Sequence, residues 1–388
     1  MTFLFASLFY FAFLYNKIMK KLIFVFATFV AFSSLSACSN NSKNTEPLLK
    51  NYAIHHDDEF GGAYINIGAE EFNALGFKYG DSVDISFTTG EKTWTDVGYY
   101  NGYYVPAGQE LLVAYPGYEN IKFCINYGDD IYADNNFDEN TKVTIKLNEA
   151  GKFKDIQDTL SISYSDDINE YTSKEEFANF REMRVDKIKE GLLFRGASPV
   201  DNSRNRAATV DSLLEENGIQ YNIDLADKNT DGTKYQVHDY FQNLVDNNKV
   251  VFLGMAAAYK KDDFAGKMKT LFETILANDG PYYIHCLEGK DRTGYVCMVI
   301  EALCGATYDE LVDDYFITYK NYYGIEKGTS KYNAIKELHI DEMIRYVFGF
   351  EKNTHLLGAA YHTSVNNYLL SIGLTQEQID AVQEKLSK

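Results

Sequence analysis

One short stretch of the chain places a cysteine and an arginine where they could act together. Cys286 lies six positions before Arg292, and the residues between them read Leu-Glu-Gly-Lys-Asp. An apolar, β-favouring run over residues 281–285 comes before the cysteine, and a helix-compatible apolar run follows from Thr293. The stretch therefore joins a predicted strand to a predicted helix N-terminus, which is where ligands bind in open α/β sheets.

A tight loop of this composition would suit an anion. Its backbone N–H groups would point inward, and the helix N-terminus would add partial positive charge. Gly289 permits a tight turn, and Arg292 offers two donors in one plane to phosphoryl oxygens. A cysteine at the floor of such a cradle is favoured as the thiolate. The pattern predicts in-line attack on phosphorus, a phosphocysteine intermediate and its hydrolysis.

A buried thiol beside a solvated charge cluster is the alternative. It leaves unexplained why the cysteine, glycine, arginine and threonine all fall where one mechanism needs them. We therefore predict Cys286 and Arg292 as catalytic residues. The predicted phosphate-binding residues are Leu287, Glu288, Gly289, Lys290, Arg292 and Thr293. Thr293 is expected to donate its hydroxyl to the thiolate, and Lys290 to favour a second negative group on the substrate.

A leaving alkoxide or phenolate needs a proton donor, and three carboxyl groups are candidates. Asp291 lies within the loop and is the first candidate. Asp224 and Asp227 are its rivals, because they lie at and just after the end of a predicted strand over residues 221–225. Strand ends of a parallel sheet share one edge, so both could face the same crevice. His285 is expected to orient the loop through ring hydrogen bonds.

The stretch H-C-L-E-G-K-D-R-T-G, residues 285–294, resembles the signature of cysteine-dependent protein tyrosine phosphatases. In this fuller form it looks like the bacterial branch with HCxxGKDRTG loops. The similarity covers about residues 173–388, including LLFRGASP (192–199), GIQYNIDLAD (218–227) and YLLSIGLTQEQIDAVQEKL (368–386). It implies hydrolysis of phosphotyrosine in proteins, and in some members also of phosphoserine, phosphothreonine or phosphoinositides.

The chain departs from the family's pattern at one position beside a candidate proton donor. An arginine commonly follows the strand's Asp-Leu in that family, whereas Ala226 stands here, which puts the role of Asp224 in doubt and favours Asp291. Residues expected near the mouth of the pocket, or else in a solvated loop, are Arg195, Asn202, Arg204 and Arg206.

The elements that must position the loop fall into two patterns. From residue 166 onward, strand and helix patterns alternate, which predicts an α/β domain over 166–388 with a largely parallel central sheet flanked by helices. Residues 51–165 contain short alternating runs such as 83–87 and 143–147, which predict a small all-β barrel or sandwich. This region loosely resembles the C-terminal β-barrel of S-adenosylmethionine hydroxide adenosyltransferases.

The N-terminus is predicted to contain an export signal. A basic pair after Met19, an apolar run and small residues predict a secretory signal over residues 1–37, with translation starting at Met19. The order Leu-Ser-Ala-Cys ending at Cys38 resembles a bacterial lipobox, so we expect Cys38 to be lipidated and residues 38–50 to form a linker. The expectation is an exported lipoprotein anchored to the membrane of the cell envelope, with a simple signal-anchor helix as the alternative.

Charge and cysteine content limit the partners, metals and cofactors that we expect. A net charge of −19 argues against nucleic acid as a partner. The cysteine spacings fit neither a disulfide scaffold nor a zinc site, so we expect no metal and no cofactor. The expected partner is a phosphorylated protein, or in the alternative an inositol phosphate or phosphoinositide. A surface ligand-binding lipoprotein with a vestigial phosphatase domain is a further alternative, which the intact Cys286 and Arg292 disfavour.

Overall fold

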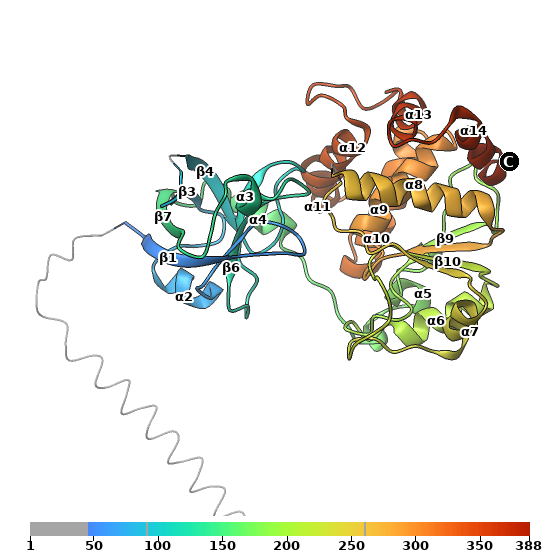
Figure 1. Ribbon diagram of the computed structural model, residues 1–388, viewed down its shortest axis with the longest axis horizontal. Coiled ribbons are helices and arrows are strands. Elements are labelled where there is room, and N and C mark those ends of the chain that lie inside the picture. Colours follow the sequence, from blue (N-terminus) through green and yellow to red (C-terminus); the bar gives the residue numbers. More distant parts are fainter. Residues whose placement is uncertain (1–45, 91, 260) are drawn as a thin grey trace, which may run out of the picture. The chain divides into compact units, whose positions relative to one another are not determined.

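The computed structural model describes residues 46–90, 92–259 and 261–388, and residues 47–388 form one compact unit (Figure 1). The predicted signal, Cys38 and most of the predicted linker lie outside the described residues. Strand β1 begins at Leu48, so the last residues of the predicted linker belong to that strand. No helix in the described part of the chain is both long and apolar enough to cross a membrane.

Seven strands close into a barrel in the order β1-β2-β6-β5-β4-β3-β7. Neighbours are antiparallel, except that β4 and β5 are parallel. The strands are β1 (Leu48–His56), β2 (Ala63–Ile65), β3 (Ser82–Phe87), β4 (Thr93–Tyr100), β5 (Glu110–Val113), β6 (Ile121–Ile125) and β7 (Lys142–Glu149). This arrangement confirms the barrel alternative of the predicted β region.

Alternating side chains explain why these segments pair. Val83, Ile85 and Phe87 of β3 are buried, and Val143 and Ile145 of β7 are buried beside them in the barrel core. The region is not all-β, because three short helices accompany the strands. These are α2 (Ala69–Ala74), α3 (Ile131–Asp134) and α4 (Lys154–Leu160).

A second sheet has five strands in the order β11-β10-β12-β9-β8. The strands are β8 (Arg181–Glu182), β9 (Leu193–Gly196), β10 (Tyr221–Asp224), β11 (Val250–Phe252) and β12 (Tyr282–His285). All pairs are parallel except that of β8 with β9. The register pairs His285 with Asp224 on one side and with Gly196 on the other, so three strands end together.

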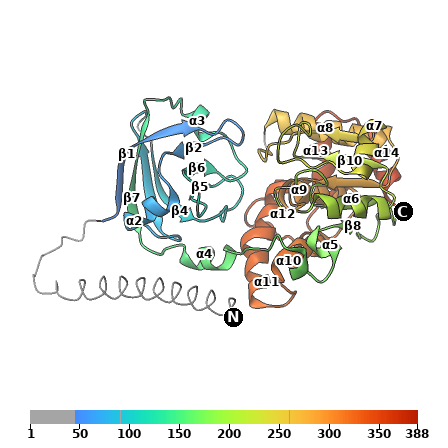
Figure 2. The ribbon, with the colours of Figure 1, turned by 90° about the horizontal axis from the view of Figure 1, so that it is seen from below.

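Helices cover both faces of this sheet (Figures 1 and 2). Tyr282 and Ile284 of β12 pack in the core with α8 and α9, whereas Tyr283, between them, packs in the core with α6. The helices of this region are α5 (Lys174–Phe177), α6 (Ala207–Glu216), α7 (Asp239–Asp246), α8 (Asp262–Ala277), α9 (Asp291–Leu303), α10 (Tyr308–Tyr323), α11 (Ser330–Ile335), α12 (Asp341–Phe348), α13 (Tyr361–Ser371) and α14 (Gln376–Leu386), with a 3-10 turn at Ile168–Glu170 and a π-helical turn at Lys336–Ile340.

Local signals in the sequence set several helix ends. Capping boxes at Thr307 and Thr375 begin α10 and α14, and the Ser173 side chain caps α5.

The last barrel strand ends at Glu149 and the five-stranded sheet begins at Arg181. The proposed domain boundary near residue 165 falls between these two strands.

Candidate active site

Cys286 follows β12 at the carboxyl edge of the five-stranded sheet. Its side chain is buried, with 3% of the residue exposed. Helix α9 begins at Asp291, two residues before the helix-compatible run that was expected from Thr293. Arg292 and Thr293 therefore lie in the first turn of α9, so their side chains are fixed by helical backbone.

The loop between β12 and α9 is pinned through its carbonyl groups. The amide N–H of Ser198 donates to the carbonyl oxygen of Leu287 at 3.0 Å. The Tyr322 hydroxyl donates to the carbonyl oxygen of Glu288 at 2.8 Å, and Arg195 Nη2 donates to that of Gly289 at 3.0 Å. Three successive carbonyl groups are thus held by the surrounding scaffold.

The N–H groups of the same loop are left free to bind an anion. Within the described residues, no hydrogen bond uses the amide N–H of Leu287, Glu288, Gly289 or Lys290. Successive free N–H groups of this kind form an anion-binding concavity, and the α9 N-terminus adds to its positive potential. The loop can therefore accept a phosphoryl group through its backbone.

Two side chains of α9 add further donors. Arg292 Nη1 donates to the carbonyl oxygen of Met255 at 3.0 Å, which fixes the guanidinium. Burial alone would lower the pKa of Arg292, but negative charge on the Cys286 thiolate and its other neighbours raises it. The hydroxyl of Thr293 is buried and has no hydrogen-bond partner among the described residues. Both groups can donate to a thiolate or to an anion bound above it.

A buried network of ion pairs inside the fold holds Arg195, which donates a hydrogen bond to the loop. Arg195 Nη1 pairs with Asp314 Oδ2 at 2.5 Å, and Arg181 Nε pairs with Asp314 Oδ1 at 3.1 Å. Burial alone would raise the pKa of Asp314, but the two arginines hold it below its usual range. Arg195 is fully buried, so it lies under the loop and not at the pocket mouth where it was expected.

His285 bridges the loop and the neighbouring strand. Its Nε2 lies 2.9 Å from Asn222 Oδ1, and its Nδ1 lies 3.4 Å from the carbonyl oxygen of Cys286. These contacts fit a role in orienting the loop.

The other described cysteines, Cys124, Cys297 and Cys304, are free and buried. Burial raises the pKa of Cys297 to about 12, which suits an inert core thiol.

Residues 173–388 match the model of the tyrosine phosphatase family. This chain belongs to that family. It is therefore a cysteine-dependent phosphatase, which agrees with the loop geometry described above. No curated protein matches the chain.

Solved structures with some likeness to this phosphatase share little of its sequence. The core catalytic domain of the PP-IP phosphatase SIW14 from S. cerevisiae, in complex with citrate, is 18% identical with a TM-score of 0.27, covering 44% of this chain and 91% of that one. A second structure of the Siw14 catalytic core is 16% identical with a TM-score of 0.27, covering 50% and 94%. An uncharacterized conserved protein from Thermotoga maritima is 18% identical with a TM-score of 0.21, covering 27% and 38%.

The three candidate proton donors of this phosphatase differ in environment. Asp224 is fully buried, and its Oδ1 accepts from the N–H groups of Ala226 and Asp227 at 2.8 and 2.9 Å. Burial, together with the charge of Asp227, raises the pKa of Asp224. Asp227 Oδ1 accepts from the Tyr235 hydroxyl at 2.7 Å. Asp291 alone is substantially accessible, with 39% of its side chain exposed.

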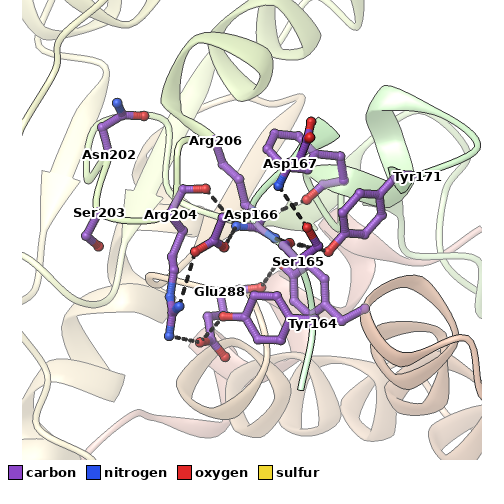
Figure 3. Close-up of polar contacts among 12 residues, drawn as sticks. Tyr164, Ser165, Asp166, Asp167, Tyr171, Asn202, Ser203, Arg204, Arg206 and Glu288 are labelled. Carbon is purple, nitrogen blue, oxygen red and sulfur yellow. Dashed lines mark hydrogen bonds and ion pairs between the residues drawn. The ribbon is translucent and has the colours of Figure 1, made fainter. Parts of the chain in front are cut away.

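Residues of the polar loop before α6 make specific polar contacts with other parts of the fold (Figure 3). Arg206 is buried; its Nε donates to the carbonyl oxygen of Phe177 at 2.8 Å and its Nη1 pairs with Asp166 at 2.7 Å. Arg204 is 42% exposed and lies 3.9 Å from Glu288. Asn202 Nδ2 donates to Gln236 at 2.8 Å. Of these residues, Arg204 reaches the signature loop, whereas Arg206 is a structural residue inside the fold.

Lys290 of the loop lies among charged and tyrosine side chains, and two further tyrosines stack near the segment that holds Arg292. Lys290 Nζ lies 3.4 Å from Glu288, 3.9 Å from Asp291 and 3.5 Å from the Tyr323 hydroxyl. Burial alone would lower the pKa of Lys290, but Asp291, Tyr323 and Glu288 raise it well above its usual value. Tyr259 follows the Met255 segment that holds Arg292, and Tyr127 stacks on it at 4.7 Å.

Several residues that build this site were not predicted from the sequence. Asp314, Met255 and Tyr322 hold the loop or its arginine, and Tyr164 contacts Glu288. None lies within a motif, and each is distant in sequence from the loop it supports. No signal in a single sequence distinguishes them from ordinary core or surface residues.

Proposed function

We propose that this phosphatase hydrolyses aromatic phosphomonoesters, with phosphotyrosine in proteins as the physiological substrate class. The observation that carries the proposal is the balance of charge around the signature loop. Lys290 is paired with Glu288 and Asp291, and Arg204 with Asp166. Among the described residues, Arg292 forms no ion pair within 4.0 Å. One unpaired guanidinium with a ring of N–H groups suits one phosphoryl group.

The rim of the loop favours an aromatic substrate. Tyr164 stacks on Tyr322 with a centroid separation of 4.6 Å, and Tyr323 lies beside Lys290. Aromatic side chains present flat apolar surface with a polar edge, which suits a phenyl ring. An inositol polyphosphate would instead require several unpaired cations around the first phosphate.

The proposed reaction uses the loop in two steps. The Cys286 thiolate attacks phosphorus, so that an S–P bond forms while the P–O bond to the leaving group breaks. Asp291, as the carboxylic acid, gives its proton to the departing phenolate oxygen. Water then attacks the phosphocysteine, the S–P bond breaks to return the thiolate, and the Asp291 carboxylate takes the proton from that water. Arg292 and the loop N–H groups stabilise the charge on the transferring phosphoryl oxygens.

A substrate panel tests the proposal. The full chain would be assayed with a phosphotyrosine peptide, a phosphoserine peptide, inositol hexakisphosphate and phosphatidylinositol phosphate vesicles, with Cys286→Ser as the control. We expect the highest kcat/KM for the phosphotyrosine peptide and no turnover by the variant. Preferential hydrolysis of the inositol phosphate or the vesicles would establish the alternative substrate class instead.

We also propose that the protein is exported and anchored to the membrane through lipidated Cys38. The support is the order Leu-Ser-Ala-Cys after a basic and apolar segment. Metabolic labelling with palmitate in a bacterial host should label the wild-type chain in the membrane fraction. Cys38→Ala should remain unlabelled, and equal labelling of both chains would contradict the proposal.

A further inference from the structure

The signature loop contains an acidic residue whose negative charge would weaken the binding of a phosphoryl group. Glu288 lies between Cys286 and Arg292, and a carboxylate there repels a dianionic phosphoryl group. Its side chain is 20% exposed, so solvent screens it only in part. Burial alone would raise the pKa of Glu288, but Lys290, Tyr164 and Arg204 lower it. The carboxyl group is therefore charged at neutral pH, and its charge must be compensated by neighbouring groups.

Part of that compensation comes from outside the loop (Figure 3). The Tyr164 hydroxyl donates a short hydrogen bond to Glu288 Oε1, and Arg204 Nη2 lies 3.9 Å from the same oxygen. Lys290, within the loop, is the third partner at 3.4 Å. Two of the three partners thus belong to segments far from the loop in sequence.

Residues 164–166, the strap, are held firmly in place. The Asp166 carboxylate pairs with Arg204 at 3.3 Å and with Arg206 at 2.7 Å. The carbonyl oxygen of Ser165 accepts from the Tyr171 hydroxyl at 2.6 Å and from Arg206 at 3.0 Å. The guanidinium of Arg206 also lies 5.1 Å from the centroid of the Tyr164 ring. Tyr164 is therefore fixed before any substrate arrives.

The strap reaches Glu288 by a second route. The Tyr164 ring stacks on Tyr322 at 4.6 Å, and the Tyr322 hydroxyl donates to the carbonyl oxygen of Glu288 at 2.8 Å. Tyr164 thus contacts the side chain of Glu288 directly and its backbone through Tyr322. The strap comes before residue 173, where the match to the family begins.

We propose that Tyr164 is a positioning residue of the phosphate-binding loop, and that its hydrogen bond holds the Glu288 carboxylate beside Lys290 and Arg204, which offset its charge so that the loop can bind a dianion. The catalytic unit of this phosphatase then begins before the family match, at residue 164. This inference rests on the phosphatase activity of the site but not on the identity of its substrate.

Calorimetric titration with inorganic phosphate tests the inference without turnover. The full chain carrying Cys286→Ser would be compared with the same chain carrying Tyr164→Phe as well, which removes the hydroxyl and keeps the ring. Because a hydrogen bond to a charged group contributes about 1.5 kcal/mol or more, the Kd for phosphate should rise about tenfold. Tyr240→Phe, which loses a hydroxyl bond of 2.8 Å to the Ile219 carbonyl oxygen, is the matched control and should leave the Kd unchanged.

A double-mutant cycle separates charge compensation from general loosening. In a Glu288→Gln background there is no carboxylate charge for the Tyr164 hydroxyl to hold away from the phosphate, so Tyr164→Phe should leave the Kd for phosphate unchanged. In the active enzyme, Tyr164→Phe should raise KM for an aryl phosphate about tenfold while kcat changes far less. An unchanged Kd in the first comparison, or an equal rise in the Glu288→Gln background, would overturn the inference. Failure to hydrolyse phosphotyrosine would overturn only the proposed substrate.

Discussion

Gly289 lies against the end of strand β9 so closely that it admits no side chain. A β-carbon on Gly289 would lie 2.3 Å from the carbonyl oxygen of Gly196, and the Gly289 φ angle is +70°. The peptide of Gly289 also accepts a hydrogen bond from Arg195 at 3.0 Å. The loop is therefore shaped by direct contact with β9, and its curvature depends on glycine at this position.

Gly289→Ala should displace the loop from β9. The backbone strain of an alanine at positive φ is about 1–2 kcal/mol, and the clash with Gly196 adds a shift of the loop. Since a displacement of about 1 Å can lower catalysis about a hundredfold, we expect kcat/KM for an aryl phosphate to fall by about that factor or more.

Gly191→Ala is the control for strain alone. Gly191 has a φ angle of +68°, and no atom lies within 4 Å of the position that a β-carbon would take there. Gly191→Ala should lower the midpoint of thermal unfolding slightly and leave kcat/KM unchanged. Equal activity of Gly289→Ala and Gly191→Ala would refute the role of the contact with β9.

Replacing the three candidate acids one at a time identifies the proton donor. Asp291→Asn should lower kcat about a hundredfold or more for phenyl phosphate, whose leaving group needs a proton. It should have little effect on dinitrophenyl phosphate, whose phenolate leaves unassisted. Asp224→Asn and Asp227→Asn should show no such dependence on the leaving group. A dependence that appears with Asp224→Asn, and not with Asp291→Asn, would move the role to the buried carboxyl.

Glu301 should make the stability of the protein fall as pH rises. Glu301 is fully buried in α9, and burial followed by the charge of Asp314 raises its pKa well above the ordinary 4.5. Between the unfolded and folded pKa values, the folded state holds a proton that the unfolded state has released. Unfolding is then favoured by about 1.4 kcal/mol for each pH unit in that window.

Glu301→Gln removes this titration and keeps the side-chain shape. Denaturant unfolding at pH 5 and pH 8 should show the variant gaining stability relative to the wild type as pH increases. The comparison between the two chains cancels the other titrating groups. A difference in the free energy of unfolding that stays constant with pH would show that Glu301 is not a proton-holding group.

The chemistry of the site was predictable because it is local in sequence. Cys286, Gly289 and Arg292 lie in one loop, and their spacing alone indicates a phosphate cradle with a nucleophile. The strands and most helix limits near the loop also follow from alternation and capping residues such as Thr307. The start of α9 was misplaced because Asp291 and Arg292 have no apolar periodicity, although they adopt helical backbone.

The supporting residues were not predictable because their environment is set by distant partners. Arg195 and Arg206 are charged residues in a polar stretch, which usually indicates exposure. Both are buried because Asp314 and Asp166, respectively, neutralise them from remote parts of the chain. The contact of Tyr164 with Glu288 spans 124 positions, so no local pattern could indicate it.

The role of Cys286 is tested most directly by comparing wild type with Cys286→Ser on a chromogenic aryl phosphate in the presence of a metal chelator. We expect rapid turnover by the wild type and none by the variant. The variant should still bind inorganic phosphate or orthovanadate, because Arg292 and the loop N–H groups are intact. Full activity in Cys286→Ser would show that this cysteine is not the nucleophile.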